Sequence, residues 1–252
     1  MRARSAWAGL GLFLFGLLLA EVGVRFLGWD SRFFPAPSTI LARLTLMLQE
    51  PSFREHVLAS GIRWSLGLCI AMLLSVALVV LASLWSGARS FLNALVGLLT
   101  PLPKSAVFPM FLLLFGIEGA GHVALITMGA SSLILATLLA GLVRLEAVGY
   151  LPLARALSLN RWRTLVRVIL PGLVPDFIQG LKLGSNYALV LVVVSEMMMT
   201  RKGLGVVLWA SWDNFRIVDL YAVLYLICLI GMATFVVFEH LNEWAMDYQK
   251  GV

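Results

Sequence analysis

The sequence contains few charged residues, few histidines and only two cysteines. Charged residues occupy 13% of the 252 positions, against 61% for hydrophobic ones, which excludes a disordered chain and an ordinary soluble domain. Cys69 and Cys228 each lie inside an apolar run, which argues against a disulfide framework and a Cys-x-x-Cys metal or redox site. The three histidines lie far apart and form no His-Glu-x-x-His motif, so the sequence predicts neither a metal site nor a catalytic centre.

Patterns that bind nucleotides or nucleic acids are also missing. The sequence has no Gly-x-x-x-x-Gly-Lys loop, so the chain is not expected to hydrolyse nucleotide or to carry a cofactor, and any such energy must come from a partner. The net charge of +6 comes from 19 basic residues scattered between apolar runs. Because they form no stripe that could follow phosphates, we expect no nucleic-acid partner.

What the sequence does contain is a series of long apolar runs. A helix needs about 20 apolar residues to cross a hydrocarbon core of about 30 Å, and such runs are too long for the alternating strands of a membrane barrel. Six candidate spans occur, at residues 6–27, 61–84, 91–115, 123–143, 177–200 and 220–239. The sequence therefore predicts an all-α membrane protein in which residues 1–252 form a single transmembrane domain with six transmembrane helices.

Basic residues between the spans indicate the orientation of the bundle. The segment between the fourth and fifth spans holds five arginines against two carboxylates, Glu146 and Asp176, and Arg2 and Arg4 precede the first span. By the positive-inside rule, we expect this segment and both termini to be cytoplasmic, in a bacterial inner membrane. Residues 39–49 place apolar side chains at helical spacing, which predicts an amphipathic helix at the outer interface or against the bundle.

Residues 150–171 are too polar to span the membrane and too few to form a domain. They are expected to form two helical pieces with a break near residues 158–160. In the second piece Trp162, Leu165, Val166 and Ile169 form an apolar stripe. Pro171 is expected to push the preceding residue out of helical geometry and to end the element. A helix pair with an apolar face and a basic rim is suited either to docking on another protein or to resting on anionic membrane lipid.

The third predicted span contains three prolines and a lysine. Pro101, Pro103 and Pro109 each remove a backbone donor, so this helix is expected to kink, and broken backbone at membrane depth usually lines a cavity. Lys104 lies among them and is a candidate for the path of a solute, because an ammonium group inside a membrane is energetically costly. The alternative is that Lys104 lies near the cytoplasmic end and extends to lipid phosphates.

The fifth predicted span carries small residues at one end and a carboxylate at the other. Gly180 and Gly184 have the spacing that lets two helices approach closely, either between two copies or within one. Lys182 lies beside them and is expected to meet Asp176 or the interface. Glu196 is a second path candidate that could gate the outer mouth or pair with a nearby basic residue; the alternative is a carboxylate at the water boundary.

One set of residues in segment 150–171 resembles the cytoplasmic EAA loop of ABC importer permeases. The resemblance is narrower to the nitrate, sulfonate and taurine branch of binding-protein-dependent permeases. It is carried by Ala154, Leu157, Ser158, Arg161, Trp162, Arg163, Leu170 and Pro171. The usual Glu-Ala-Ala start falls on Pro152, Leu153 and Ala154, and the usual glycine falls on Ser158. The stretches FPAPSTIL, TPLPKSAVFPMFLLLFGI and SEMMMTRKGLGVVL resemble further segments of the same family and extend the likeness over nearly the whole chain.

The resemblance implies a bundle like that of a type I ABC importer permease. It implies a second permease copy, a cytoplasmic ABC ATPase dimer that holds ATP and Mg and grips the 150–171 coupling loops, and a periplasmic or lipid-anchored solute-binding protein. The solute would be small and anionic, such as a sulfonate, taurine, nitrate or bicarbonate, or else a thiamine-related pyrimidine. The competing hypothesis is a membrane scaffold or passive channel whose basic loop binds lipid.

Overall fold

The structure is a computed structural model built of helices. It describes the backbone of residues 2–116, 119–198 and 200–250, and the side chains of residues 11, 15–116, 119–198 and 200–243. The long helices are α1 (Arg2–Phe26), α3 (Pro51–Leu84), α6 (Ala120–Ala147), α10 (Val174–Met198) and α12 (Ile217–Lys250). Shorter ones are α2 (Pro37–Gln49), α4 (Ser86–Leu99), α5 (Lys104–Phe115), α7 (Tyr150–Ala156), α8 (Arg161–Thr164), the π-helix η1 (Leu165–Ile169), α9 (Leu170–Gly172) and α11 (Leu204–Asp213).

The expected all-α membrane fold is confirmed, but the count of six spans is not. The helices α3, α6, α10 and α12 are long and apolar enough to cross a membrane, and the pair α4 and α5 adds a fifth span if both belong to one crossing. The first predicted span coincides with α1, but the side chains of residues 2–10 and 12–14 lie outside the described ones, so its character as a span is untested.

The third predicted span is broken rather than merely kinked. The axes of α4 and α5 are bent by 106° across a break of four residues, 100–103. Pro101 and Pro103 both lie in this break, where two missing donors and two restricted backbone angles prevent the helix from continuing. Pro109 lies inside α5 without interrupting it. The prediction of broken backbone is therefore confirmed, and the break belongs to the first two prolines.

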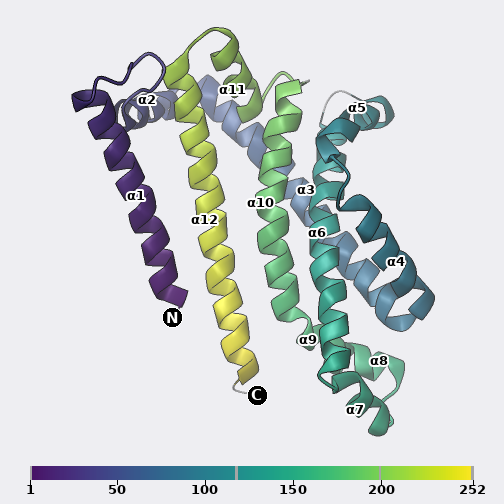
Figure 1. The fold of residues 1–252 in the computed structure, drawn as a ribbon. Coiled ribbons are helices and arrows are strands. Elements are labelled where there is room, and N and C mark those ends of the chain that lie inside the picture. The colour runs from purple at the N-terminus through teal and green to yellow at the C-terminus, as the bar shows by residue number, and fades with distance from the viewer. Residues whose placement is uncertain (1, 117–118, 199, 251–252) are drawn as a thin grey trace.

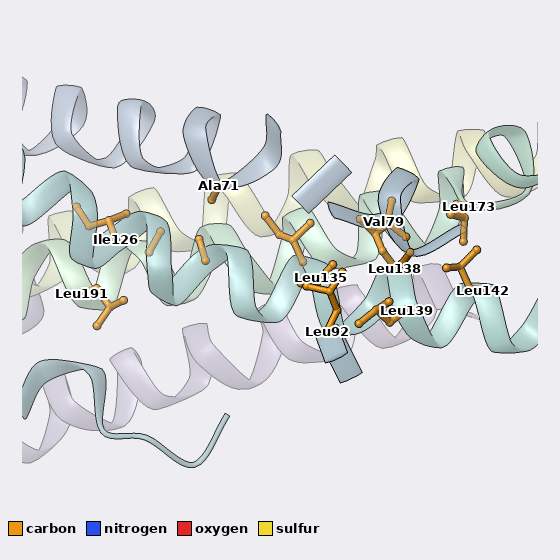
Figure 2. Packing of buried hydrophobic residues seen from close by; sticks show 14 of the residues in the cluster. Ala71, Val79, Leu92, Ile126, Leu135, Leu138, Leu139, Leu142, Leu173 and Leu191 are labelled. Carbon is orange, nitrogen blue, oxygen red and sulfur yellow. The ribbon is translucent and has the colours of Figure 1, made fainter. Parts of the chain in front are cut away.

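The core of the bundle surrounds α6, which packs between α3 and α10. Buried leucines, isoleucines and alanines from these helices and from α4 interdigitate along its length (Figure 2). Small residues allow the close approach of α10 to α6: a Cβ on Gly180 would lie 2.3 Å from Oγ1 of Thr137, and one on Gly184 would lie 2.9 Å from Cγ1 of Ile134. The two glycines therefore pack within one copy, which decides between the two alternatives that the sequence left open.

The two ends of the bundle carry different elements. Figure 1 shows both described termini at the same end as α7 and α8, which we call the loop end, whereas α2 and α11 lie at the opposite end, the α11 end. The predicted amphipathic helix is α2, which buries Ile40, Leu44 and Met47 against α12. Arg43 of α2 donates to Oδ1 of Asp219 at 2.5 Å, and this hydrogen bond raises the pKa of Arg43 above its ordinary value.

Candidate functional site

The predicted coupling loop forms a compact turn of short helices at the loop end. Helix α7 stops at Ala156, and Ser158 adopts a left-handed conformation with φ of 55°. The chain restarts at Asn160, whose side-chain oxygen accepts a hydrogen bond from the Arg163 amide at 2.7 Å and so caps α8. The break therefore lies where the sequence predicted it. Its left-handed residue is the position at which the resembling family carries glycine, the residue that adopts this conformation without strain.

The prediction that Pro171 would force Leu170 out of helical geometry is wrong. Leu170 has φ of −59° and ψ of −49°, and its amide donates to the carbonyl of Leu165, five residues earlier. The wider π-helical turn of η1 removes the usual carbonyl from beneath the proline ring, so helical backbone passes through Pro171. The segment ends two residues later, at Leu173, directly before α10.

The predicted apolar stripe of the second piece is divided between two faces. Leu165 and Ile169 are buried in the main core, whereas Trp162 is 66% exposed and Val166 is 44% exposed. The π-helix contributes to this division because it changes the angular spacing of the side chains that follow it. Ala154 of α7 is buried and anchors the first piece.

The outward side of these helices forms an exposed surface that we call the loop face. Its members are Leu153, Leu157, Trp162 and Val166, with Arg161, Arg163 and Arg167 around them, and Leu170 and Pro171 at its edge. Within the described residues, none of the three arginines forms an ion pair with a carboxylate. An apolar patch with free guanidinium groups beside it can bind an apolar, acidic partner surface.

Ion pairs join the short helices of the loop end to the spans behind them. Glu146, at the end of α6, lies 3.0 Å from Nη1 of Arg89 in α4 and 3.8 Å from Nη2 of Arg155 in α7. Arg144 donates to Oδ2 of Asp176 at 2.6 Å and to the carbonyl of Gly172. The short helices are therefore tied to α4, α6 and α10 at once.

Lys104 does not extend to the lipid surface, so the interpretation of a lysine at a membrane boundary is wrong. The residue is only 4% exposed. Its ammonium donates to the carbonyl of Thr100 at 3.2 Å and lies 5.5 Å from the ring centroid of Tyr187. Tyr187 is at the middle of α10, so the ammonium faces α10 rather than the outer surface of the bundle. The bend between α4 and α5 turns this side chain inward.

Glu196 is also placed differently from its expected position. It is 1% exposed rather than at a water boundary, and it pairs with Arg63 of α3, at 2.7 Å, rather than with the basic residues that follow it. Ser60 donates to the same carboxylate, and the Gly205 amide at the start of α11 donates to it at 3.1 Å. The carboxylate therefore holds α3, α10 and α11 together at the α11 end.

Two glycines make room for this carboxylate. Gly203 has φ of +150°, and a Cβ on it would lie 2.3 Å from Cδ of Glu196. A Cβ on Gly205 would lie 2.3 Å from the carbonyl oxygen of Val193. The Gly-Leu-Gly sequence is thus required by the close approach of the chain to the buried carboxylate.

The sequence reasoning missed Arg63 as a functional-site residue because this residue lies near the start of the predicted span 61–84 and was counted among the basic residues of the outer side. Helix α3 begins at Pro51, ten residues before the predicted start, so Arg63 lies well inside it. Lys182 was also paired wrongly: its partner is Glu239 of α12, and its ammonium lies over the ring of Phe235. In both cases the signal in the sequence was a charged residue inside an apolar run. Such a residue needs a partner of opposite charge, because an unpaired charge inside a membrane is energetically costly.

An apolar groove of about 870 Å³ lies between α3, α4 and α6. Its walls include Leu66 and Ile70 of α3, Leu99 at the end of α4, and Met128 and Ser132 of α6. Arg63 lies at its border, so the groove passes from the Glu196 cluster toward the break between α4 and α5.

Comparison with known proteins identifies several relatives. No protein-family model matches the chain. The taurine transport system permease protein TauC of Escherichia coli (strain K12) is 28% identical over 178 residues, covering 69% of this chain and 64% of that protein. The putative aliphatic sulfonates transport permease protein SsuC of Bacillus subtilis (strain 168) is 24% identical over 200 residues, covering 79% and 72%. The match thus spans just under two thirds of the taurine permease.

A third relative matches nearly the whole chain. The formylaminopyrimidine transport permease protein ThiX of Halalkalibacterium halodurans is 25% identical over 240 residues, which cover 94% of each chain. Together with the apolar spans, these similarities support a multi-pass membrane protein that is similar to transport permeases. The resemblance that the motifs predicted is confirmed: over most of its length this chain is similar to permease proteins of ABC transport systems, among them those named for taurine and aliphatic sulfonates.

Proposed function

We propose that this chain is the permease subunit of an ATP-driven ABC importer in a bacterial inner membrane, with the loop end and both termini in the cytoplasm. The single observation that supports this most is the loop face, which presents exposed apolar side chains beside three arginines that have no acidic partner among the described residues. The names of the relatives, which are transport permeases, point in the same direction.

In this proposal energy enters through the loop face. A cytoplasmic ABC ATPase dimer, holding ATP and Mg, would bind Trp162 and its neighbours and move them when it closes. Glu146 would pass that movement to α4 through Arg89 and to α7 through Arg155. Such coupling requires that the loop make different contacts with the ATPase in the inward-facing and outward-facing states. An ATPase that bound both states equally well would not shift the equilibrium between them.

The solute path would lie between two permease copies and open alternately to each side. The break at Pro101 and Pro103 supports this, since irregular backbone inside a membrane is tolerated where it lines a cavity or is buried in protein. Lys104 and Glu196 are buried charges that would contribute to the path. A periplasmic or lipid-anchored binding protein would deliver a small anionic solute, such as a sulfonate, taurine, nitrate or bicarbonate, to the α11 end.

The test is to replace Trp162 and Arg163 by alanine in the full chain, co-expressed with its proposed partner, an ABC ATPase with Walker motifs. We expect at least a tenfold loss of co-purifying ATPase, because an aromatic and an arginine commonly dominate binding energy at interfaces. The matched control replaces Trp209 and Arg32, which are exposed away from the loop face. Equal ATPase recovery from both variants would contradict the proposal, and ATP-independent solute flux in liposomes would instead favour a passive channel.

A further inference from the structure

Lys104 is a buried cation that has no carboxylate partner in the part of the chain that the structure describes. An ammonium group has three donors, and the contacts that it makes are one hydrogen bond to a carbonyl and the face of Tyr187. Lys182, a partly buried lysine in the spans, differs because it is paired with Glu239. Arg63 is likewise paired with Glu196. An unpaired buried charge is energetically costly. Lys104 differs from Lys182 and Arg63 because no carboxylate among the described residues offsets its charge.

The backbone around Lys104 adds to its positive potential. Lys104 is the first residue of α5, and no side chain caps this helix, since its N-cap is Pro103. The first amides of α5 therefore carry the positive end of a 12-residue helix dipole. Because a helical side chain leans back toward its own N-terminus, the ammonium lies over the same gap, against the carbonyl of Thr100. Half-helix N-termini of this kind hold anionic groups of substrates in membrane transporters.

The apolar groove ends close to this gap, because its lining includes the residue directly before Thr100. Its α4 wall ends at Leu99, directly before Thr100, and its α6 wall includes Met128 and Ser132. Few side chains hold α4 and α5 in place: within the described residues only Ala88, Leu92, Lys104 and Phe108 are buried on them. Few buried side chains therefore fix the angle between the two half-helices beside Lys104.

From these observations we infer that Lys104 and the N-terminus of α5 form an anion-binding site at the break between α4 and α5. The site takes a small oxyanion group, a sulfonate or a carboxylate, whose oxygens accept from the ammonium and from the first amides of α5. This inference rests on the proposed function, because it identifies the charged group that the solute presents inside the path. An anion site at this position would favour an anionic solute over a neutral pyrimidine.

The test uses the purified full chain in detergent and methanesulfonate as the probe, with ionic strength held constant by potassium chloride, whose anion has neither a sulfonate nor a carboxylate group. We expect the melting temperature to rise in a saturable way by about 2–4 °C, because a ligand that binds only the native state stabilises it. Lys104→Met should abolish the rise, and Lys104→Arg should keep part of it. Lys202→Met, which removes an exposed lysine at the α11 end, should respond like the wild type.

Two results would overturn the inference. One is the absence of a saturable rise in the wild type, and the other is an equal rise in Lys104→Met. If Lys104→Met does not fold, Lys104→Gln makes the same comparison. The assay contains no ATPase, so its outcome is independent of the co-purification test. A failed docking test with a positive titration would remove the importer and leave the anion site, and the reverse result would remove only the site.

Discussion

At the scale of single residues, the charges that look alike in the sequence have different environments. Lys104, Lys182 and Glu196 all lie in or beside apolar runs. Glu196 is fully paired and hydrogen-bonded, Lys182 has its acid on α12, and Lys104 has no acidic partner among the described residues. The difference arises because the packing of the helices brings an acidic residue close to some of these charges and not to others. Glu196 and Lys182 therefore belong to structural ion pairs, whereas Lys104 is a candidate binding group.

The Glu196 cluster should behave as a structural ion pair. Glu196→Ala leaves Arg63 buried without its carboxylate, and we expect a loss of about 3–5 kcal/mol in the free energy of unfolding. The double variant Glu196→Ala with Arg63→Met should recover part of that loss, because no isolated charge then remains. Thermal and denaturant unfolding of the purified variants measures both. A Glu196→Ala protein as stable as the wild type would show that the pair is not formed.

At the scale of elements, the third span is the least regular part of the bundle. Its two halves are bent by 106° at Pro101 and Pro103, while α6 and α10 are held straight together by glycines and buried leucines. The sequence predicted an interruption here because proline removes donors, but it gave no angle. The angle depends on where α5 finds partners, in particular on Phe108, which packs edge-on against His122 at 4.9 Å.

Removing the two prolines should straighten this span. In a Pro101→Ala and Pro103→Ala variant the four-residue break can join α4 to α5. Spin labels at Leu98 and Leu113, both exposed, would then move toward the separation of about 22 Å that 15 residues of continuous helix produce. Double electron–electron resonance between the two spin labels measures this distance. Pro109→Ala is the matched control and should leave the distance of the wild type unchanged; an unchanged distance in the double variant would show that packing alone sets the bend.

At the scale of the whole molecule, the two ends of the bundle differ in composition and should face different compartments. The loop end carries three arginines without acidic partners in the described region, Arg161, Arg163 and Arg167. At the α11 end most basic residues are paired, as Arg43 is with Asp219 and Lys202 with Glu55, although Arg54 and Arg201 form no ion pair with a described residue. This asymmetry supports the orientation that the positive-inside rule predicts.

Cysteine labelling in intact cells tests that orientation. After both native cysteines are replaced by serine, Trp209→Cys at the α11 end should react with a membrane-impermeant maleimide added outside. Leu157→Cys on the loop face should react only after the cells are opened. Both positions are exposed in this structure, so a lack of access does not explain a difference. The opposite labelling pattern would invert the orientation and exclude cytoplasmic energy input through the loop face.

The sequence by itself determined the helical membrane class, the approximate position of five apolar runs, the interruption at Pro101 and Pro103 and the break near Ser158. These follow from hydropathy, proline and local backbone preference, which act over a few residues. The tertiary structure alone decided which charges meet, that Leu165 and Ile169 turn inward while Trp162 turns outward, and that a π-helix carries the chain through Pro171. Such features depend on side chains from helices distant in sequence, whose contacts form only when the bundle packs.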